Sequence, residues 1–260
     1  MGTVVATVGG CGGAGASVLA AVLARAGARA GPVLLVDVDP HGGGLGALFA
    51  GRAATPRTVR AVDLSRVQGP LPTGALPAVL PEVDGVHLLD VNRSRLDRAA
   101  VPAVVAAARA EMRLVVVDLP RAPGGPAGGL AGGLAAAADA VLLVCPAREQ
   151  AVRAARTVLA GLGAEVDEVH LVVRRPHDLP PALVAGELGV PLLAELPTER
   201  GLARAVARGE PPGLARRSSV RGTAEAILRR LPSAPGPMVG GPAEERDRVI
   251  GRLVAGPGRG

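Results

Sequence analysis

The sequence predicts a three-layer α/β domain, in which a mainly parallel seven-stranded sheet has helices on both of its faces. Short valine- and leucine-rich runs alternate with alanine-rich helical runs, a pattern typical of βαβ units with right-handed crossovers. Hydrophobic residues make up 48% of the chain and Phe49 is its only aromatic residue, so the core must be aliphatic, as in a buried parallel sheet. The length of 260 residues suits one large domain, or one domain with a tail.

The elements can be assigned in order along the chain. The predicted strands are residues 3–8, 33–36, 86–89, 114–117, 140–145, 169–173 and 192–195. The predicted helices are residues 15–28, 99–110, 148–162, 181–188, 201–207 and 220–231. Residues 126–145 are apolar but glycine-rich and contain Asp139, so we divide them into a helix and a strand and predict no membrane span there. Residues 1–231 then form the α/β domain, and residues 232–260 form a proline- and glycine-rich linker with a short basic tail.

The first predicted strand leads into a glycine-rich loop with the shape of a phosphate-binding loop. Residues 10–17 read GCGGAGAS, and a helical run follows them. Successive glycines let backbone N–H groups converge on a phosphate, and the start of the helix adds the positive end of its dipole. Ala16, however, stands where the phosphate-gripping lysine belongs, and all 29 basic residues are arginine. Tight turns also use glycine for purely structural reasons, so the loop alone is weak evidence for nucleotide binding.

Acidic residues end two further strands. Asp37 and Asp39 follow the second strand, and such a pair can orient a water near a terminal phosphate. The apolar run LVVVD ends in Asp118, which is the Walker B pattern, whose carboxylate holds Mg²⁺ directly or through water. The hydroxyl of Ser17 would be a further Mg²⁺ ligand. Each feature alone could be an ordinary strand end, but three of them in order on three strand ends are much more specific.

These motifs and three later segments resemble the MinD/ParA group of deviant-Walker P-loop ATPases over residues 3–231. The later segments are ADAVLLVCPAREQAVRAA, HLVVRRP and GVPLLAELPTERGLARAVARGEPP. Within that group, the sequence is most similar to the actinobacterial CpaE/TadZ-like branch, which includes septum-site-determining proteins. The resemblance implies ATP and Mg²⁺ as cofactors, with Mg²⁺ at Ser17 and Asp118 and a water-orienting role for Asp39. It implies nucleotide binding by Gly12, Gly13, Ala14, Gly15, Ala16, Ser17, Arg174 and Pro197.

The sequence also departs from the pattern of this group. The two lysines of the deviant-Walker loop are replaced by Cys11 and Ala16, and the asparagine that many members use to read adenine is replaced by Arg174. We therefore expect weak or no hydrolysis, and whether the chain is an enzyme stays open. Arg121 or Arg148 could supply a positive charge instead, the alternative being that each simply faces solvent. Many CpaE-like relatives carry an N-terminal receiver-like domain, and we expect that domain to be absent here or encoded separately.

The sequence therefore predicts a CpaE/TadZ-like spatial regulator that positions a Tad/Flp-type pilus or secretion apparatus, or acts in septum-site selection. Two alternatives remain. One is an active MinD/ParA-type ATPase that uses arginine in place of lysine, and the other is a ParA-like partition protein that binds DNA without sequence preference. The resemblance implies Tad/Flp pilus or secretion proteins, or division proteins, as partners, and it implies a homodimer.

The charge is concentrated near the C-terminus. Residues 201–260, the basic C-terminal quarter, carry 11 arginines and 5 acidic residues, whereas residues 1–200 carry 18 of each. This quarter is either a solvated surface or a contact for anionic membrane or DNA. An apolar stripe in the tail is too short for more than marginal membrane binding. Two cysteines and an N-terminus without a basic signal region predict a cytoplasmic protein, with peripheral contact at the inner face of the cell membrane as a further option.

Overall fold

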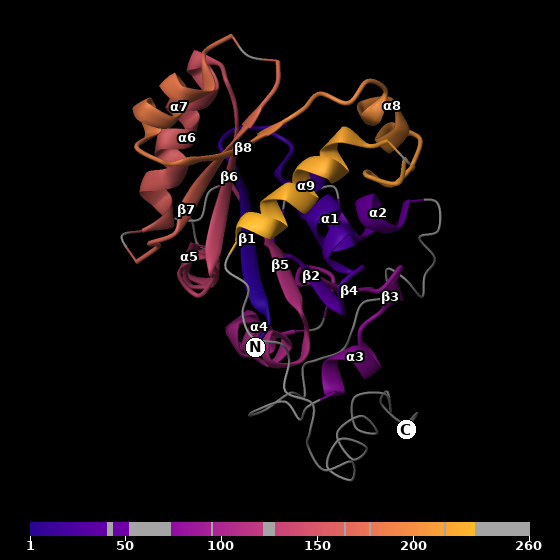
Figure 1. Ribbon diagram of the computed structural model, residues 1–260. Helices are drawn as coiled ribbons and strands as arrows, with labels where there is room; N and C mark the ends of the chain where they lie inside the picture. Colours follow the sequence, from indigo (N-terminus) through magenta and orange to yellow (C-terminus); the bar gives the residue numbers. More distant parts are fainter. Residues whose placement is uncertain are drawn as a thin grey trace.

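The computed structural model describes residues 1–40, 44–51, 74–94, 96–121, 128–163, 165–176, 178–215 and 217–231. In these residues, one eight-stranded sheet carries helices on both faces (Figure 1), which confirms the predicted fold class. The linker and tail expected over residues 232–260 lie outside the described residues, and so does Arg216 of the basic C-terminal quarter. The domain boundary at residue 231 therefore stays a prediction.

Seven parallel strands correspond to the seven predicted ones. They are β1 (Thr3–Gly9), β2 (Val33–Asp37), β4 (Val86–Asp90), β5 (Leu114–Asp118), β6 (Ala140–Pro146), β7 (Val169–Arg174) and β8 (Leu192–Leu196). The additional strand is β3 (Glu82–Val83), which pairs with β4 in antiparallel orientation through a turn at Asp84 and Gly85. Both turn residues have positive φ, of 51° and 77°, as two-residue hairpin turns require.

The strand order is β3-β4-β2-β5-β1-β6-β7-β8. From β1 the chain passes to β2 and β4 on one side, returns to insert β5 between β2 and β1, and then adds β6, β7 and β8 on the other side of β1. The direction of the strand order therefore reverses near β1, which makes this region a topological switch point. In open α/β sheets, ligands bind in the crevice beyond the carboxyl ends of the strands at such a point. The order therefore directs attention to the ends of β1, β5 and β2.

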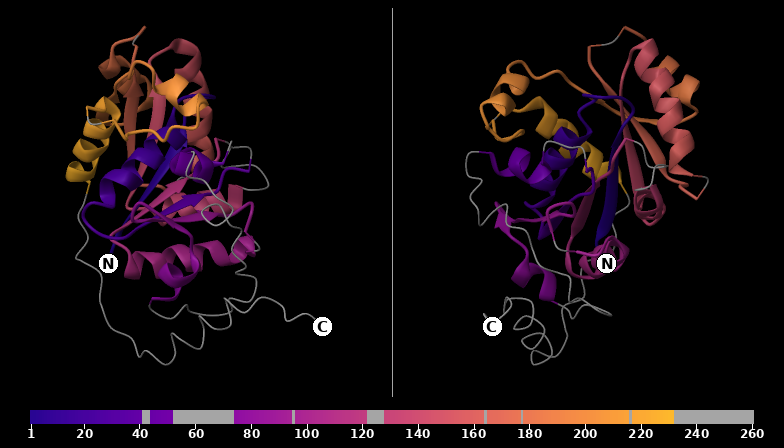
Figure 2. Two further views of the ribbon diagram at one scale, coloured as in Figure 1. Left: turned by 90° about the vertical axis from the view of Figure 1, so that its right-hand side faces the viewer. Right: turned by 180° about the vertical axis from the view of Figure 1, so that it is seen from behind.

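The helices divide between the two faces of the sheet (Figures 1 and 2). One face carries α1 (Ala16–Gly27), α2 (Leu45–Ala50) and α9 (Ser219–Arg230). The other carries α3 (Ala75–Val79), α4 (Val101–Glu111), α5 (Gly128–Ala136), α6 (Glu149–Leu162) and α7 (Pro181–Leu188). The short helix α8 (Leu202–Ala207) precedes α9. None of the helices in the described residues is long and apolar enough to cross a membrane.

The core has one apolar layer on each face of the sheet. Along β1, Val4, Ala6 and Val8 join one layer and Val5 joins the other, because successive strand residues point to opposite faces. Helix α1 packs between the sheet and α9, so it is apolar around most of its circumference. Its single charged residue is Arg25, whose guanidinium lies 4.3 Å from the centre of the fully buried ring of Phe49.

Candidate functional site

The turn between β1 and α1 leaves the start of the helix open to a ligand. Gly13 and Gly15 have φ values of 69° and 99°, in the left-handed region that residues with a Cβ rarely adopt. The N–H of Ala14 donates to the carbonyl of Cys11 at 3.3 Å, which closes the turn. Gly15 is the residue before α1, and no side chain caps the first turn of this helix. Its N–H groups and dipole can therefore bind an anion.

Asp118 lies beside this turn, at the end of β5. Its side chain is buried, and its Oδ1 accepts a hydrogen bond of 2.9 Å from the hydroxyl of Thr7. Ser17 also hydrogen-bonds to the Asp118 carboxylate, so the structure brings the two predicted Mg²⁺ ligands together. Burial raises the pKa of Asp118 to about 7; the hydrogen bonds from Ser17 and Thr7 oppose this rise, and the charges of Asp37 and Asp39 add to it.

The two carboxylates that follow β2 have different surroundings. Asp37 is only 5% exposed and accepts backbone hydrogen bonds from Asp39 (3.1 Å) and from Leu45 (2.8 Å) at the start of α2. Burial raises its pKa to about 6, against the effect of the hydrogen bond from Leu45, and the nearby charge of Asp90 raises it further. Asp39 is half-buried and lines a cavity together with Ser17. Asp37 thus links the end of β2 to the start of α2, and Asp39 is positioned to meet a ligand.

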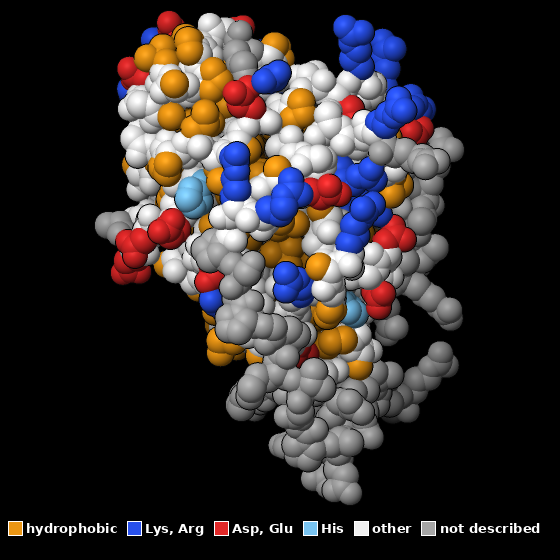
Figure 3. Space-filling view, viewed as in Figure 1, with side chains coloured by type: hydrophobic (Ala, Val, Ile, Leu, Met, Phe, Trp, Pro, Cys, Tyr) orange, Lys and Arg blue, Asp and Glu red, His pale blue; other side chains and the backbone are white. Residues whose placement is uncertain are grey.

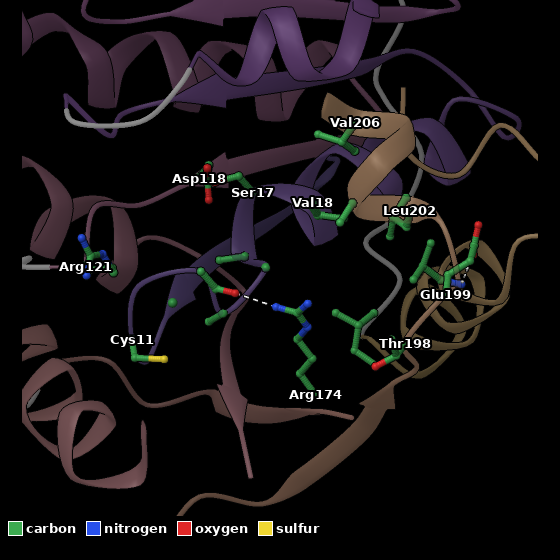
Figure 4. A pocket seen from close by; sticks show the side chains of 18 of the residues that line it. Cys11, Ser17, Val18, Asp118, Arg121, Arg174, Thr198, Glu199, Leu202 and Val206 are labelled. Atoms are coloured by element: carbon green, nitrogen blue, oxygen red, sulfur yellow. Dashed lines mark hydrogen bonds between the residues drawn. The ribbon is translucent and has the colours of Figure 1, made fainter. Parts of the chain in front are cut away.

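A cavity of about 500 Å³ opens over the turn (Figure 4), within the size range of small-molecule sites. Its polar end contains the turn, Ser17, Asp39 and Asp118. Its other end is mostly apolar and is lined by Val18, Leu196, Pro197, Leu202, Ala203, Val206 and Val220. Of the residues predicted to bind nucleotide, all but one line this cavity; Gly12 lines an adjoining hollow with Cys11 and Arg148.

The sequence motifs did not assign a role to the cavity wall formed by α8 and the start of α9. Leu202, Val206 and Val220 lie roughly 185 to 203 residues after the glycine-rich loop, and they fall on helices predicted from the sequence but were not assigned to the site. Glu199 explains their position: its carboxylate accepts hydrogen bonds from the Ser218 hydroxyl (2.8 Å) and the Val220 N–H (3.3 Å) at the start of α9. This contact fixes the α8–α9 segment beside the cavity.

Arginine side chains lie on both sides of the turn. The Nη1 of Arg174, at the end of β7, donates to the Gly13 carbonyl at 2.6 Å. Arg121, which follows β5, has its Nη1 3.2 Å from the position that a Cβ on Gly12 would occupy. Arg148 is instead paired with Asp178 at 3.4 Å. Of the two arginines that the sequence analysis considered as replacements for lysine, the structure therefore places Arg121 in the cavity wall and Arg148 outside it.

The arrangement fits Mg²⁺ bound together with a phosphate ligand. The described residues contain no group of three or more His, Cys, Asp or Glu side chains that could hold a metal ion by themselves. Mg²⁺ does not need such a group, because it usually binds to one or two protein ligands, water and substrate phosphates. Ser17 and Asp118 would be those protein ligands, and the uncapped start of α1 would receive the phosphates.

The chain has relatives of unknown activity. No protein-family model matches it. Two uncharacterized proteins of Mycobacterium tuberculosis, one from each of two strains, are 40% identical to it over 237 residues. The match covers 90% of this chain and 65% of each relative, so the chain spans less than two thirds of the length of the curated relatives it matches.

Solved structures with the same architecture define the class of fold. A ParA family ATPase from Chlorobium tepidum has a TM-score of 0.71 at 16% identity, covering 87% of this chain and 98% of that chain. The septum site-determining protein MinD from Pyrococcus horikoshii, complexed with Mg-ADP, has a TM-score of 0.67 at 18% identity, and the match covers 98% of this chain and 100% of that chain. A chain of the MinC:MinD cell division protein complex from Aquifex aeolicus has a TM-score of 0.65 at 22% identity, and the match covers 92% of this chain and 100% of that chain. The chain therefore has the fold of the MinD and ParA ATPases.

Proposed function

We propose that this chain is a CpaE/TadZ-like spatial regulator, which positions a Tad/Flp-type pilus or secretion apparatus or acts in septum-site selection. The observation that carries the proposal is the Ser17–Asp118 pair at the uncapped start of α1, in a loop with Cys11 and Ala16 at the lysine positions. Such a site keeps the groups that bind Mg²⁺ and phosphate but lacks the loop cation that stabilises phosphoryl transfer. This supports positioning that depends on bound nucleotide, with weak or no hydrolysis.

Each part of the cavity has a role in this proposal. The N–H groups of the loop and of the first turn of α1 bind the phosphates, and Ser17 and Asp118 hold Mg²⁺. Bound Mg²⁺ neutralises phosphate charge. The apolar end, with Leu202 and Val206, covers the base and excludes water from it. Asp39 orients a water at the terminal phosphate.

Nucleotide binding and turnover test the chemical part of the proposal. In calorimetric titrations, we expect ATP to bind in a Mg²⁺-dependent manner and Asp118→Ala to abolish that dependence. Steady-state turnover should be roughly 10²- to 10³-fold below that of lysine-bearing P-loop enzymes, because a transition-state donor is missing. Turnover at ordinary P-loop rates that is abolished by Asp39→Ala would instead support the active ATPase alternative.

Localisation tests the spatial part. A fluorescent fusion of the chain in its host should concentrate at a cell pole or at the septum, and Asp118→Ala should make it diffuse if positioning depends on nucleotide. Asp97→Asn, a conservative change outside the cavity at the start of a 3₁₀ turn, is the matched control and should leave the pattern unchanged. A wild-type fusion spread evenly through the cell would contradict the proposal.

The partners also belong to this proposal. A solved MinC:MinD complex exists for a protein of the same fold, which supports division proteins as partners here, beside Tad/Flp pilus or secretion proteins. The proposal also includes the formation of a homodimer and peripheral contact of the protein with the inner face of the cell membrane. A ParA-like DNA-binding protein is the second candidate, favoured by the arginine side chains that gather over α8 and α9 (Figure 3).

A further inference from the structure

We infer that Arg174 and Arg121 bind the phosphate groups of a nucleoside di- or triphosphate from the two sides of the loop, and so supply for nucleotide binding, but not for hydrolysis, the positive charge that Ala16 cannot. The inference rests on the proposed nucleotide site and names the residues that make it work without lysine. In Figure 4, the two arginines lie on opposite sides of the loop that carries Cys11 and leads to Ser17. Both line the cavity.

Arg174 is held against the start of α1. Its Nη1 donates to the carbonyl of Gly13, and its Cδ and Nη1 lie 3.9 Å from the position that a Cβ on Gly15 would occupy. These distances place the guanidinium in van der Waals range of position 15, beside the first turn of the helix. A single Nη1 bond to Gly13 leaves other N–H groups of the guanidinium fork to meet phosphate oxygens.

Arg121 approaches the same loop from the other side. Its Nη1 is 3.2 Å from a Cβ built on Gly12, so the glycine there allows this close approach, and its Cγ is 3.7 Å from a Cβ built on Gly9, an ordinary contact distance. Within the described part of the chain, Arg121 forms no hydrogen bond or ion pair. Its charge is therefore not neutralised by a described acidic partner, although it lines a cavity that contains Asp39 and Asp118.

The other arginines near the loop have acidic partners. Arg148 pairs with Asp178, and Arg175 pairs with Glu195 through an Nη2–Oε2 contact of 2.7 Å. Among the described acidic residues that line the cavity, Glu199 accepts hydrogen bonds from Ser218 and Val220 at the start of α9 and forms no ion pair with Arg121 or Arg174. With Mg²⁺ at Asp118, the two guanidiniums are the main positive side chains that a polyphosphate would meet among the described residues. A guanidinium suits this task because its planar fork matches two phosphate oxygens.

Nucleotide affinities of single variants test the inference. Calorimetric titrations with Mg-ATP, Mg-ADP and adenosine would be made on wild type, Arg174→Gln, Arg121→Gln and Arg175→Gln. We expect the first two substitutions to weaken Mg-ATP binding about 10- to 100-fold, the range for losing a charged hydrogen-bond partner, and to leave adenosine binding unchanged. The matched control Arg175→Gln, on the neighbouring residue with its own acidic partner, should stay within about twofold of wild type.

A compensation experiment separates charge replacement from a structural effect. If Arg174 stands in for the missing lysine, Ala16→Lys should improve Mg-ATP binding more in the Arg174→Gln background than in wild type, since only there is the charge missing. Thermal unfolding would confirm that each variant is folded. Arg174→Lys, which keeps the charge but loses the fork, should bind with intermediate affinity.

Two results would overturn the inference and leave the nucleotide site standing. The first is Mg-ATP affinity within about twofold of wild type for both Arg174→Gln and Arg121→Gln. The second is Mg-ATP binding by the Ala16→Lys variant when wild type does not bind Mg-ATP, because the arginines would then not supply the charge that binding needs. If neither wild type nor Ala16→Lys binds Mg-ATP, the proposed nucleotide site itself is wrong, and the inference falls with it.

Discussion

At the scale of single residues, Asp118 determines how the free energy of unfolding responds to pH. The ordinary pKa of an aspartate is 3.8, and burial raises that of Asp118 to about 7. Between these values the folded state holds a proton that the unfolded state has released, so the free energy of unfolding falls as the pH rises from about 4 to about 7. Asp37, raised to about 6, acts in the same direction. Above neutral pH, the molecule pays the full cost of keeping two buried carboxylates ionised beside each other.

Asp118→Asn should therefore stabilise the protein in the absence of nucleotide and Mg²⁺. The amide oxygen can still accept from Thr7, and its NH₂ group can donate to the hydroxyl of Ser17. We expect a gain of roughly 2–4 kcal/mol in the free energy of unfolding at pH 8, which shrinks toward zero near pH 4. Urea unfolding of wild type and Asp118→Asn at pH 8 and at pH 4 measures this gain. Asp97→Asn, at an exposed turn, serves as the control; an equal gain for both variants, or a gain at pH 4, would refute the explanation.

At the scale of elements, the connection between α8 and α9 is fixed against α2 by a glycine. Gly51 ends α2 with φ of 58°, and a Cβ there would lie 2.5 Å from both the backbone oxygen of Gly209 and the ring of Pro211. No real Cβ contact is that short, so a side chain at this position would push the connection away from α2. Part of the apolar wall of the cavity lies on the two helices that flank this connection, at Leu202, Val206 and Val220.

Gly51→Ala should therefore be much more destabilising than an alanine at a similar glycine elsewhere. Gly189, at the end of α7, has φ of 65° and ψ of 26° and nothing within 4 Å of a built Cβ, so Gly189→Ala gives the cost of an ordinary left-handed conformation. Gly51 has a ψ of −136°, a conformation that suits glycine almost alone, so its larger loss combines backbone strain with the clash. We expect about 1 kcal/mol of destabilisation for Gly189→Ala and about 3 kcal/mol for Gly51→Ala, by denaturant unfolding. Similar losses for both variants would show that the clash with Gly209 and Pro211 is relieved at little cost.

The elements also show where sequence patterns are informative. Seven strands were predicted because short Val- and Leu-rich runs alternate regularly with Ala-rich helical runs. Ser17, Asp39 and Asp118 were predicted as site residues from the phosphate-loop and Walker B patterns and the family resemblance. Helices α2 and α3 were missed: they have six and five residues, and both follow a glycine with no side-chain cap to mark the start of a helix. The β3–β4 hairpin was also missed, although its Asp84-Gly85 turn is a recognised hairpin signal.

The site was predicted less completely than the fold. Spacing in the sequence does not give strand order, so only the family resemblance grouped Arg174 with Gly13, and the direct hydrogen bond from Arg174 to the Gly13 carbonyl was not predicted. Nor did it indicate that α8 would cover the other end of the cavity. Both depend on contacts between segments far apart in the chain, which local patterns do not encode.

At the scale of the whole molecule, positive charge gathers over α8 and α9 (Figure 3). The arginines of this basic surface, among the described residues, are Arg204, Arg208, Arg217, Arg221, Arg229 and Arg230. Some of them take part in local contacts: Arg208 pairs with Glu210, and Arg230 donates to the carbonyl of Leu193. Exposed charges act on a polyanion mainly through long-range attraction, which is screened beyond about 8 Å at physiological salt.

If this surface binds DNA or anionic membrane, removing its charge should weaken binding, most strongly at low salt. We compare the triple variant Arg204→Ser, Arg217→Ser and Arg229→Ser with Arg98→Ser, Arg153→Ser and Arg156→Ser, which makes the same charge change on the α4 and α6 side. Co-sedimentation with DNA and with anionic vesicles should weaken about tenfold or more for the first variant only. Equal binding by both variants would mean that the charge distribution reflects composition alone, and binding of DNA but not vesicles would favour the partition-protein alternative.

Phe49 lies fully buried beside Arg25, and the chain has neither tryptophan nor tyrosine. The molecule is therefore almost silent in near-ultraviolet absorbance and in intrinsic fluorescence. A single tryptophan introduced at Leu202, a half-buried position in the cavity wall, would be the only emitter in the protein. Its emission would follow events in the cavity without any background from the rest of the chain.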